Sequence, residues 1–101
     1  NLILTNSFSP INISEENLNM VRKAMREVVL TGLATDFRNY PLEVAAKTGT
    51  AQTTGADHTT FVCYAPYSDP QIAISVIIAN GKYGGLSKAV ARSIMDAYFK
   101  V

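Results

Sequence analysis

The sequence has little charge, a single cysteine and no long apolar run, and each shortage excludes a class of protein. Nine Lys and Arg residues nearly balance eight Asp and Glu residues, so the net charge gives no electrostatic footprint for nucleic acid or an anionic membrane surface. Cys63 has no second cysteine to pair with, which excludes an intrachain disulfide framework and a cysteine-rich zinc site. The longest apolar stretch, residues 72–79, is interrupted by Ser75 and is far shorter than the roughly 20 residues that span a bilayer.

The chain of 101 residues has the composition of one small globular domain. Apolar residues make up 48% of it and charged residues 17%, whereas disordered segments combine low hydrophobicity with high net charge. A chain of this length buries roughly 65% of the surface that it exposes when unfolded, which permits one modest core. The chain begins with Asn1 rather than Met, and we therefore expect it to be a piece of a longer protein or a processed product.

Two segments have the apolar periodicity of amphipathic helices. Residues 14–32 begin at Ser14, a suitable N-cap, and end at Gly32. The apolar stripe of this helix contains Leu18, Val21, Met25, Val28 and Val29. The second helix, residues 85–99, follows Gly84 and Gly85. We expect its buried face to consist of Leu86, Val90, Ile94, Ala97 and Tyr98.

Three segments between these helices are rich in strand-forming residues: 42–53, 59–65 and 71–79. Short connections with turn residues join them, which predicts antiparallel hairpins. Because both helices are apolar on one side, we expect both to pack on one face of the sheet. The sequence therefore predicts an α+β fold, an antiparallel sheet meander flanked by two helices, with residues 1–101 in a single domain.

The tetrapeptide Lys47-Thr48-Gly49-Thr50 lies on the first predicted strand and combines residues suited to binding a carboxylate. Lys47 supplies a positive charge, and the hydroxyl groups of Thr48 and Thr50 can donate hydrogen bonds to an anion. Gly49 removes a side chain that would block close approach to the backbone. An extended ligand could then pair with the free edge of the strand. The alternative is an ordinary threonine-rich edge strand with a protective lysine.

This tetrapeptide and its surroundings resemble the penicillin-binding proteins and serine β-lactamases, whose third motif is a Lys-Thr-Gly box on the strand that lines the active site. Residues 61–66 are similar to the Phe-x-Gly-Tyr-Ala-Pro strand typical of high-molecular-weight penicillin-binding proteins, with Cys63 in place of the glycine. The helix at 14–32 and the helix after Gly84-Gly85 also match. The resemblance covers residues 10–101, fits the class B transpeptidases best, and implies the C-terminal part of a penicillin-binding/serine β-lactamase-like transpeptidase domain.

The resemblance also implies a role for each residue of the tetrapeptide. Lys47 would hydrogen-bond the serine of a Ser-x-Asn motif, and the backbone N–H of Thr50 would form half of an oxyanion hole, so that both are catalytic. The hydroxyl groups of Thr48 and Thr50 would bind the carboxylate of the substrate, and Gly49 would keep the strand accessible. Neither a metal ion nor an organic cofactor is implied.

Two motifs of that family are absent from this chain, namely the nucleophile motif Ser-x-x-Lys and the motif Ser-x-Asn. Covalent acyl transfer needs an activated nucleophile, so we expect the chain alone to be inactive and both motifs to lie upstream of Asn1. None of the following serines has a lysine three residues later: Ser7, Ser9, Ser14, Ser68, Ser75, Ser87 and Ser93.

The function that the resemblance implies is that of a peptidoglycan D,D-transpeptidase, which cross-links stem peptides by serine acyl transfer and binds β-lactam antibiotics. Its expected partners are stem peptides, β-lactams and the rest of its own transpeptidase domain, without nucleic acid. A membrane would be reached only through an N-terminal anchor of the parent protein, at the extracytoplasmic face of the bacterial cell membrane. Two alternatives remain: a serine β-lactamase or D,D-carboxypeptidase, against which residues 64–66 argue, and a non-catalytic α+β module that binds peptides along its edge strand.

Other side chains of catalytic type have simpler structural interpretations. His58 has no acidic partner except the adjacent Asp57, so we expect it to be solvated or to form a local hydrogen bond. Cys63 lies in the middle of a predicted strand, which favours a small buried residue. The basic residues of the first helix, among them Arg26, are expected to form a solvated surface.

Overall fold

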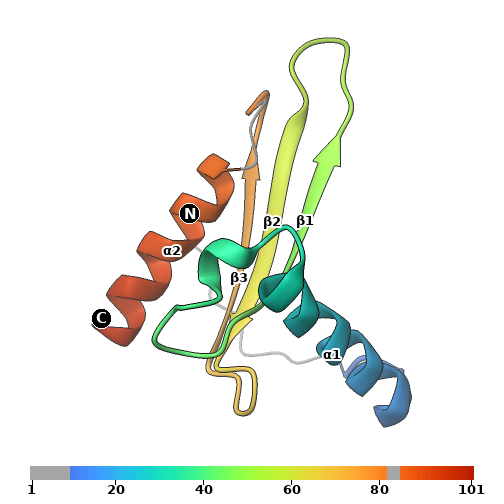
Figure 1. The fold of residues 1–101 in the computed structure, drawn as a ribbon. Helices are drawn as coiled ribbons and strands as arrows, with labels where there is room; N and C mark the ends of the chain where they lie inside the picture. The colour runs from blue at the N-terminus through green and yellow to red at the C-terminus, as the bar shows by residue number, and fades with distance from the viewer. Residues whose placement is uncertain (1–9, 82–84) are drawn as a thin grey trace, which may run out of the picture.

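The computed structural model describes residues 10–81 and 85–101 and shows a three-stranded antiparallel sheet between two helices (Figure 1). The elements in chain order are α1 (Glu15–Thr31), the 3-10 turn η1 (Thr35–Phe37), β1 (Ala45–Ala51), β2 (His58–Ala65), β3 (Ile72–Ile78) and α2 (Gly85–Phe99). The strand order is β1-β2-β3, so that β1 and β3 form the two edges. These observations confirm the predicted α+β class and antiparallel meander. Gly84, which is predicted to precede the second helix, lies outside the described residues.

Local side-chain chemistry fixes both ends of α1, as the sequence predicts. The side chain of Ser14 accepts a hydrogen bond from the backbone N–H of Asn17 at 3.1 Å, which satisfies one of the free donors of the first turn. At the other end, the N–H of Gly32 donates to the carbonyl of Val28. A Cβ atom on Gly32 would lie 2.9 Å from the Val28 backbone, so the backbone conformation with which the chain leaves the helix here needs a glycine.

The strand register places one set of alternate residues in the core. Phe61 in β2 lies opposite Thr48 in β1 and Val76 in β3, so these three side chains share a face of the sheet. The ring of Phe37 stacks on that of Phe61 with centroids 5.6 Å apart, and Met95 of α2 is fully buried against the same core. The core consists of Val29, Ala34, Phe37, Tyr40, Val44, Ala46, Phe61, Cys63, Ala65, Ile74, Val76, Ala91 and Met95.

The buried face of α2 is not the predicted one. Ser87, Ala91 and Met95 are at most 1% exposed, whereas the predicted residues, Leu86, Val90, Ile94, Ala97 and Tyr98, are all exposed. Both sets have helical spacing, so periodicity alone cannot choose between them. The small side chains at positions 87 and 91 let α2 approach the sheet closely, and the bulkier stripe faces outward. Despite this stripe, no helix within the described ranges is long and apolar enough to cross a membrane.

The two helices lie on opposite sides of the sheet, and the prediction that they share one face is wrong. α2 packs against β2 and β3, while α1 packs beside β1 (Figure 1). Met25 and Val28 of α1 line a cavity with Lys47 and Val62, and the register places both of these strand residues on the face away from the core. Val29 joins the core itself. The apolar stripe of a helix must be buried against some partner, but the stripe does not indicate which face of the sheet that partner is. A helix that lies beside an edge strand, as α1 does, can contact both faces of the sheet.

The connection between α1 and β1 contains two aromatic anchors that the sequence does not reveal. The Tyr40 hydroxyl donates a hydrogen bond of 2.7 Å to Asp96 of α2, and the Arg92 guanidinium lies over the rings of Phe37 and Tyr40. Burial, together with the hydrogen bond to the Asp96 carboxylate, raises the pKa of Tyr40 to about 12. These contacts hold the connection against α2 and so fix the point at which β1 begins.

Candidate active site

Three residues of the predicted site line one cavity, which lies between β1 and the start of α2. Thr48, Gly49 and Thr50 form one wall of this cavity of about 240 Å³, and Gly85, Ser87 and Lys88 of α2 form the other, with Leu33 and Thr60 completing the lining. Thr48 and Thr50 are two positions apart, so a strand directs both side chains to the same face. The structure therefore brings together the two hydroxyl groups that the sequence assigns to carboxylate binding.

Lys47 occupies the other face of the same strand. Its side chain is exposed and lines the cavity of about 470 Å³ formed with Val21, Ala24, Met25, Val28 and Val62. The Lys47 ammonium contacts the backbone of the motif, since its Nζ donates a hydrogen bond of 2.6 Å to the carbonyl of Thr48. The positive charge of Lys47 therefore lies close to the motif but outside the cavity that the threonines line.

β1 presents a free backbone edge, since in the described part of the chain it pairs with β2 alone. The strand begins with Ala45 and Ala46, both fully buried, and only from Lys47 onward do its side chains become accessible. An edge of this kind can form main-chain hydrogen bonds with an extended peptide. The ligand would then pass directly over the Lys47-Thr48-Gly49-Thr50 segment.

Arg26 positions the start of β1, although the sequence groups it with a solvated basic surface. Its Nη1 donates a hydrogen bond of 2.8 Å to the carbonyl of Val44, and the contact is partly buried. A second bond fixes the neighbouring segment, because the N–H of Tyr67 donates to the carbonyl of Glu43 at 2.7 Å. The sequence signal for Arg26 is its place next to the apolar stripe, one position after Met25, where a long side chain can reach across a helix face.

Gly49 has a packing role besides the accessibility that the sequence suggests. Residue 49 lies opposite Thr60 in β2, and a Cβ atom built on Gly49 would collide with Oγ1 of Thr60. The absence of a side chain at residue 49 therefore lets Thr60 keep its rotamer, in addition to leaving the strand open to a ligand. This close approach explains a glycine in the interior of a strand, where glycine is otherwise unfavourable.

We expect Gly49→Ala to destabilise the protein by about 1–2 kcal/mol, because Thr60 must leave its rotamer or the strands must separate. Thr60→Ala removes the colliding atom, so the double variant should regain most of the loss. Melting temperatures of the two single variants and the double variant measure this coupling. If the double variant shows simply the sum of the single effects, the collision is not the reason for glycine at this position.

His58 and Cys63 lie outside the site, as the sequence predicts. The Nδ1 atom of His58 accepts a hydrogen bond of 2.8 Å from the backbone N–H of Asn80, so this side chain ties the ends of β2 and β3 together. Cys63 is 3% exposed, and its burial raises the pKa of the thiol to about 11, which keeps it protonated and unreactive near neutral pH. Within residues 10–81 and 85–101, no three His, Cys, Asp or Glu side chains are grouped so that they could hold a metal ion.

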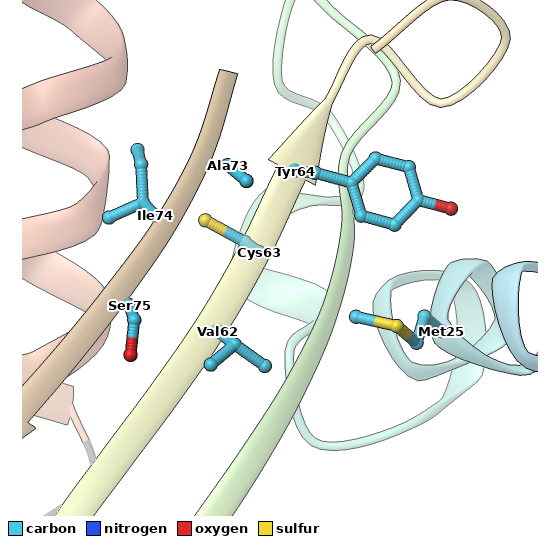
Figure 2. Close-up of a pocket in the computed structure, with 7 residues that line it drawn as sticks. All are labelled: Met25, Val62, Cys63, Tyr64, Ala73, Ile74 and Ser75. Atoms are coloured by element: carbon cyan, nitrogen blue, oxygen red, sulfur yellow. The ribbon is translucent and has the colours of Figure 1, made fainter. Parts of the chain in front are cut away.

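A separate hollow of about 270 Å³ lies between Met25 of α1 and the strands β2 and β3. Figure 2 shows Val62 and Tyr64 directed towards the α1 side, whereas Cys63 and Ile74 point towards α2. Its lining is largely apolar and contains no charged side chain. Tyr64 and Ser75 are its polar lining residues, and no residue of the Lys47-Thr48-Gly49-Thr50 segment lines it. The threonine-lined cavity therefore remains the candidate site.

A family model described as "Penicillin binding protein transpeptidase domain" matches residues 8–96. The chain belongs to the penicillin-binding protein transpeptidase family. Among curated proteins, it is 33% identical to the peptidoglycan D,D-transpeptidase MrdA of Acinetobacter baumannii, with 84% of this chain aligned. It is 32% identical to penicillin-binding protein 2A of Bacillus subtilis, with 90% of this chain aligned. The chain spans only 15% of the length of each of these two relatives.

Solved structures of the same family share this fold. Penicillin-binding protein 2 of Pseudomonas aeruginosa, in complex with WCK 5153, is 36% identical with a TM-score of 0.70 over 81% of this chain and 19% of that chain. The D,D-transpeptidase domain of a peptidoglycan glycosyltransferase from Eggerthella lenta is 28% identical with a TM-score of 0.79 over 93% of this chain and 24% of that chain. The family and fold that the Lys-Thr-Gly box and its flanking segments suggest are thus confirmed.

Proposed function

We propose that this chain is the substrate-binding, C-terminal part of a peptidoglycan D,D-transpeptidase domain that also binds β-lactam antibiotics. The observation that carries the proposal is the pair of hydroxyl groups of Thr48 and Thr50 on one cavity wall, beside the free edge of β1. A stem peptide ends in a carboxylate and has an extended backbone, and a β-lactam presents a carboxylate next to its reactive amide. Both ligands therefore match an anion site adjoining an open strand edge.

In the proposed mechanism each residue of the motif contributes a separate group. The hydroxyl groups of Thr48 and Thr50 donate hydrogen bonds to the substrate carboxylate and so orient the scissile amide. The backbone N–H of Thr50 donates to the oxygen that becomes negative when the nucleophile attacks. The Lys47 ammonium, which contacts the Thr48 carbonyl at 2.6 Å, keeps the site electropositive. The serine nucleophile and the Ser-x-Asn motif are supplied by the remainder of the domain.

Exposed apolar surface supports the proposal that further chain completes the domain. On α2 the outward stripe contains Leu86, Val90, Ile94 and Tyr98, which are 37–54% exposed, and the sheet face opposite the core exposes Val62 and Ile77. Contiguous apolar patches of this kind mark surfaces that another element covers. We propose that the preceding part of the transpeptidase domain covers them, and that an N-terminal anchor holds the parent protein at the extracytoplasmic face of the bacterial membrane.

The transpeptidase proposal is favoured over its alternatives by the names of the relatives, since MrdA is a peptidoglycan D,D-transpeptidase. A serine β-lactamase or D,D-carboxypeptidase would hydrolyse its acyl-enzyme, whereas a transpeptidase passes the acyl group to an amine. A non-catalytic peptide-binding module would form no covalent adduct at all. The persistence of the adduct with benzylpenicillin, and its transfer to an added amine, therefore separate the three classes.

We expect the isolated chain to form no covalent adduct with excess benzylpenicillin, because it has no serine with a lysine three residues later. The full-length protein should gain the mass of one benzylpenicillin. Mass spectrometry of both proteins after the same incubation measures this difference. A stable adduct on a serine of the isolated chain, or none on the full-length protein, would contradict the proposal.

A further inference from the structure

Lys88, which lies outside the Lys-Thr-Gly motif, brings a positively charged side chain to the lining of the threonine-lined cavity. It comes from α2 and lines the cavity opposite Thr48 and Thr50. Among the described residues that line this cavity, Lys88 alone carries a charge. Lys47, the lysine of the motif, lines a different cavity on the other face of β1. Lys88 is therefore the lysine that shares a cavity with the two threonine side chains.

The geometry of Lys88 is that of a fixed and partly desolvated ammonium. Its side chain is 16% exposed, and its Nζ donates to the carbonyl of Leu33 at 3.1 Å and pairs with Asp36 at 3.2 Å. Because an ammonium carries three N–H donors, these two contacts leave one donor for a further acceptor. Partial burial strengthens the attraction for an incoming anion, since less water screens the charge.

Asp36 does not cancel this charge. The Asp36 side chain is 55% exposed, so water solvates its carboxylate and the ion pair with Lys88 is weak. The carbonyl of Leu33, by contrast, is a neutral acceptor that fixes the position of Nζ without reducing its charge. Lys88 thus stays electropositive towards the cavity wall formed by Thr48 and Thr50.

We propose that Lys88 is a binding residue for the ligand carboxylate, which it holds together with the hydroxyl groups of Thr48 and Thr50 in the cavity between β1 and α2. The ligand class is a peptide with a free terminal carboxylate, or a β-lactam acid. This inference rests on the proposed function and adds a cation from outside the Lys-Thr-Gly box. It assigns ligand affinity to Lys88, while Lys47 acts on the chemical step.

The test uses full-length protein and two ligands that differ in one charge, benzylpenicillin and its methyl ester. Time courses at several ligand concentrations give the dissociation constant of the initial complex and the acylation rate constant separately. Lys88→Gln is expected to raise the dissociation constant for the acid about tenfold, the value of one charge-assisted hydrogen bond. The rate constant should change less than about twofold, and the ester should bind the variant as it binds the wild type. Lys88→Arg should retain most of the affinity for the acid.

Two control variants make the result specific. Lys23→Gln removes an exposed lysine of α1 that lines none of the described cavities and should leave both constants unchanged. Thr48→Ala tests the proposed function itself, since it should weaken binding of the acid and not of the ester. If Thr48→Ala distinguishes the two ligands and Lys88→Gln does not, the role of Lys88 is refuted and the proposed function stands. If neither variant distinguishes them, the proposed function fails, and the inference fails with it.

A further variant decides the question if Lys88→Gln lowers the melting temperature so far that binding cannot be measured. Asp36→Asn keeps the lysine and its bond to Leu33 but removes the competing carboxylate. This variant should bind benzylpenicillin about two- to threefold more tightly, because an exposed ion pair contributes only a small free energy. Its affinity for the ester should be unchanged. Unchanged or weaker binding of the acid by Asp36→Asn would overturn the proposal.

Discussion

Replacing Lys47 with alanine in the full-length protein is expected to slow acylation by benzylpenicillin about 100-fold, the typical effect of losing a group that stabilises developing charge. The melting temperature should change little. Lys47 is exposed and donates one hydrogen bond, to the adjacent Thr48 carbonyl, and exposed charges rarely contribute more than about 1 kcal/mol to stability. The measurement is the acylation rate constant with a fluorescent penicillin, alongside the melting temperature.

Lys47→Arg is the matched control for this variant, because it keeps the charge and changes its geometry. A planar guanidinium cannot reproduce the compact ammonium, so we expect only partial recovery of the rate. Wild-type acylation by Lys47→Ala would show that the motif lysine has no catalytic role. A large drop in melting temperature with a normal rate would instead support the alternative of a structural edge-strand lysine.

Phe61→Ala is expected to destabilise the protein by about 3–5 kcal/mol, the usual cost of removing a buried aromatic ring. Phe61 is fully buried, and the ring of Phe37 stacks on it at 5.6 Å, so the truncation opens a cavity between the sheet and η1. For a domain of this family the loss corresponds to a decrease in melting temperature of roughly 10 °C. Calorimetry of the full-length protein measures it.

Val62→Ala, at the next position of β2, is the control for the core assignment. Val62 lies on the face of the sheet away from the core, and the change to alanine removes two methyl groups rather than a ring, so we expect a loss of at most about 2 kcal/mol even where the rest of the domain covers this face. The two residues differ by one position in sequence and by their face of the sheet. Equal destabilisation by the two variants would contradict the observed register.

The sequence predicts the elements well because their signals are local. Ser14 and Gly32 mark the ends of α1 through capping chemistry, and the strand-forming runs mark β1, β2 and β3 to within a few residues. The facing of α2 could not be predicted, because two stripes of that helix have the same spacing. The stripe through Ala91 is buried on account of the small side chains that permit close approach, a property of the partner surface as much as of the helix.

The residues of the candidate site can likewise be separated into those that the local sequence predicts and those that only the packing of the helices brings there. Strand alternation places Thr48 and Thr50 on one face, and both line one cavity. The sequence groups Lys47 with them in a single site, whereas the side chain of Lys47 lines the cavity on the other face of β1. Lys88 is distant in sequence and enters the cavity only because α2 packs on the core face of the sheet. The place of Arg26 next to the apolar stripe of α1 indicates a side chain that can reach across the helix, but its bond to the Val44 carbonyl depends on how α1 packs beside β1.

A crystal structure of the full-length protein acylated by benzylpenicillin would show where the ligand carboxylate binds. We expect the ligand carboxylate to lie in the cavity between β1 and α2, with its oxygens about 3 Å from the hydroxyl groups of Thr48 and Thr50. We also expect the carbonyl oxygen of the acyl group to accept a hydrogen bond from the backbone N–H of Thr50. A carboxylate bound elsewhere, with the two threonine hydroxyl groups facing solvent, would show that Thr48 and Thr50 do not form the carboxylate site.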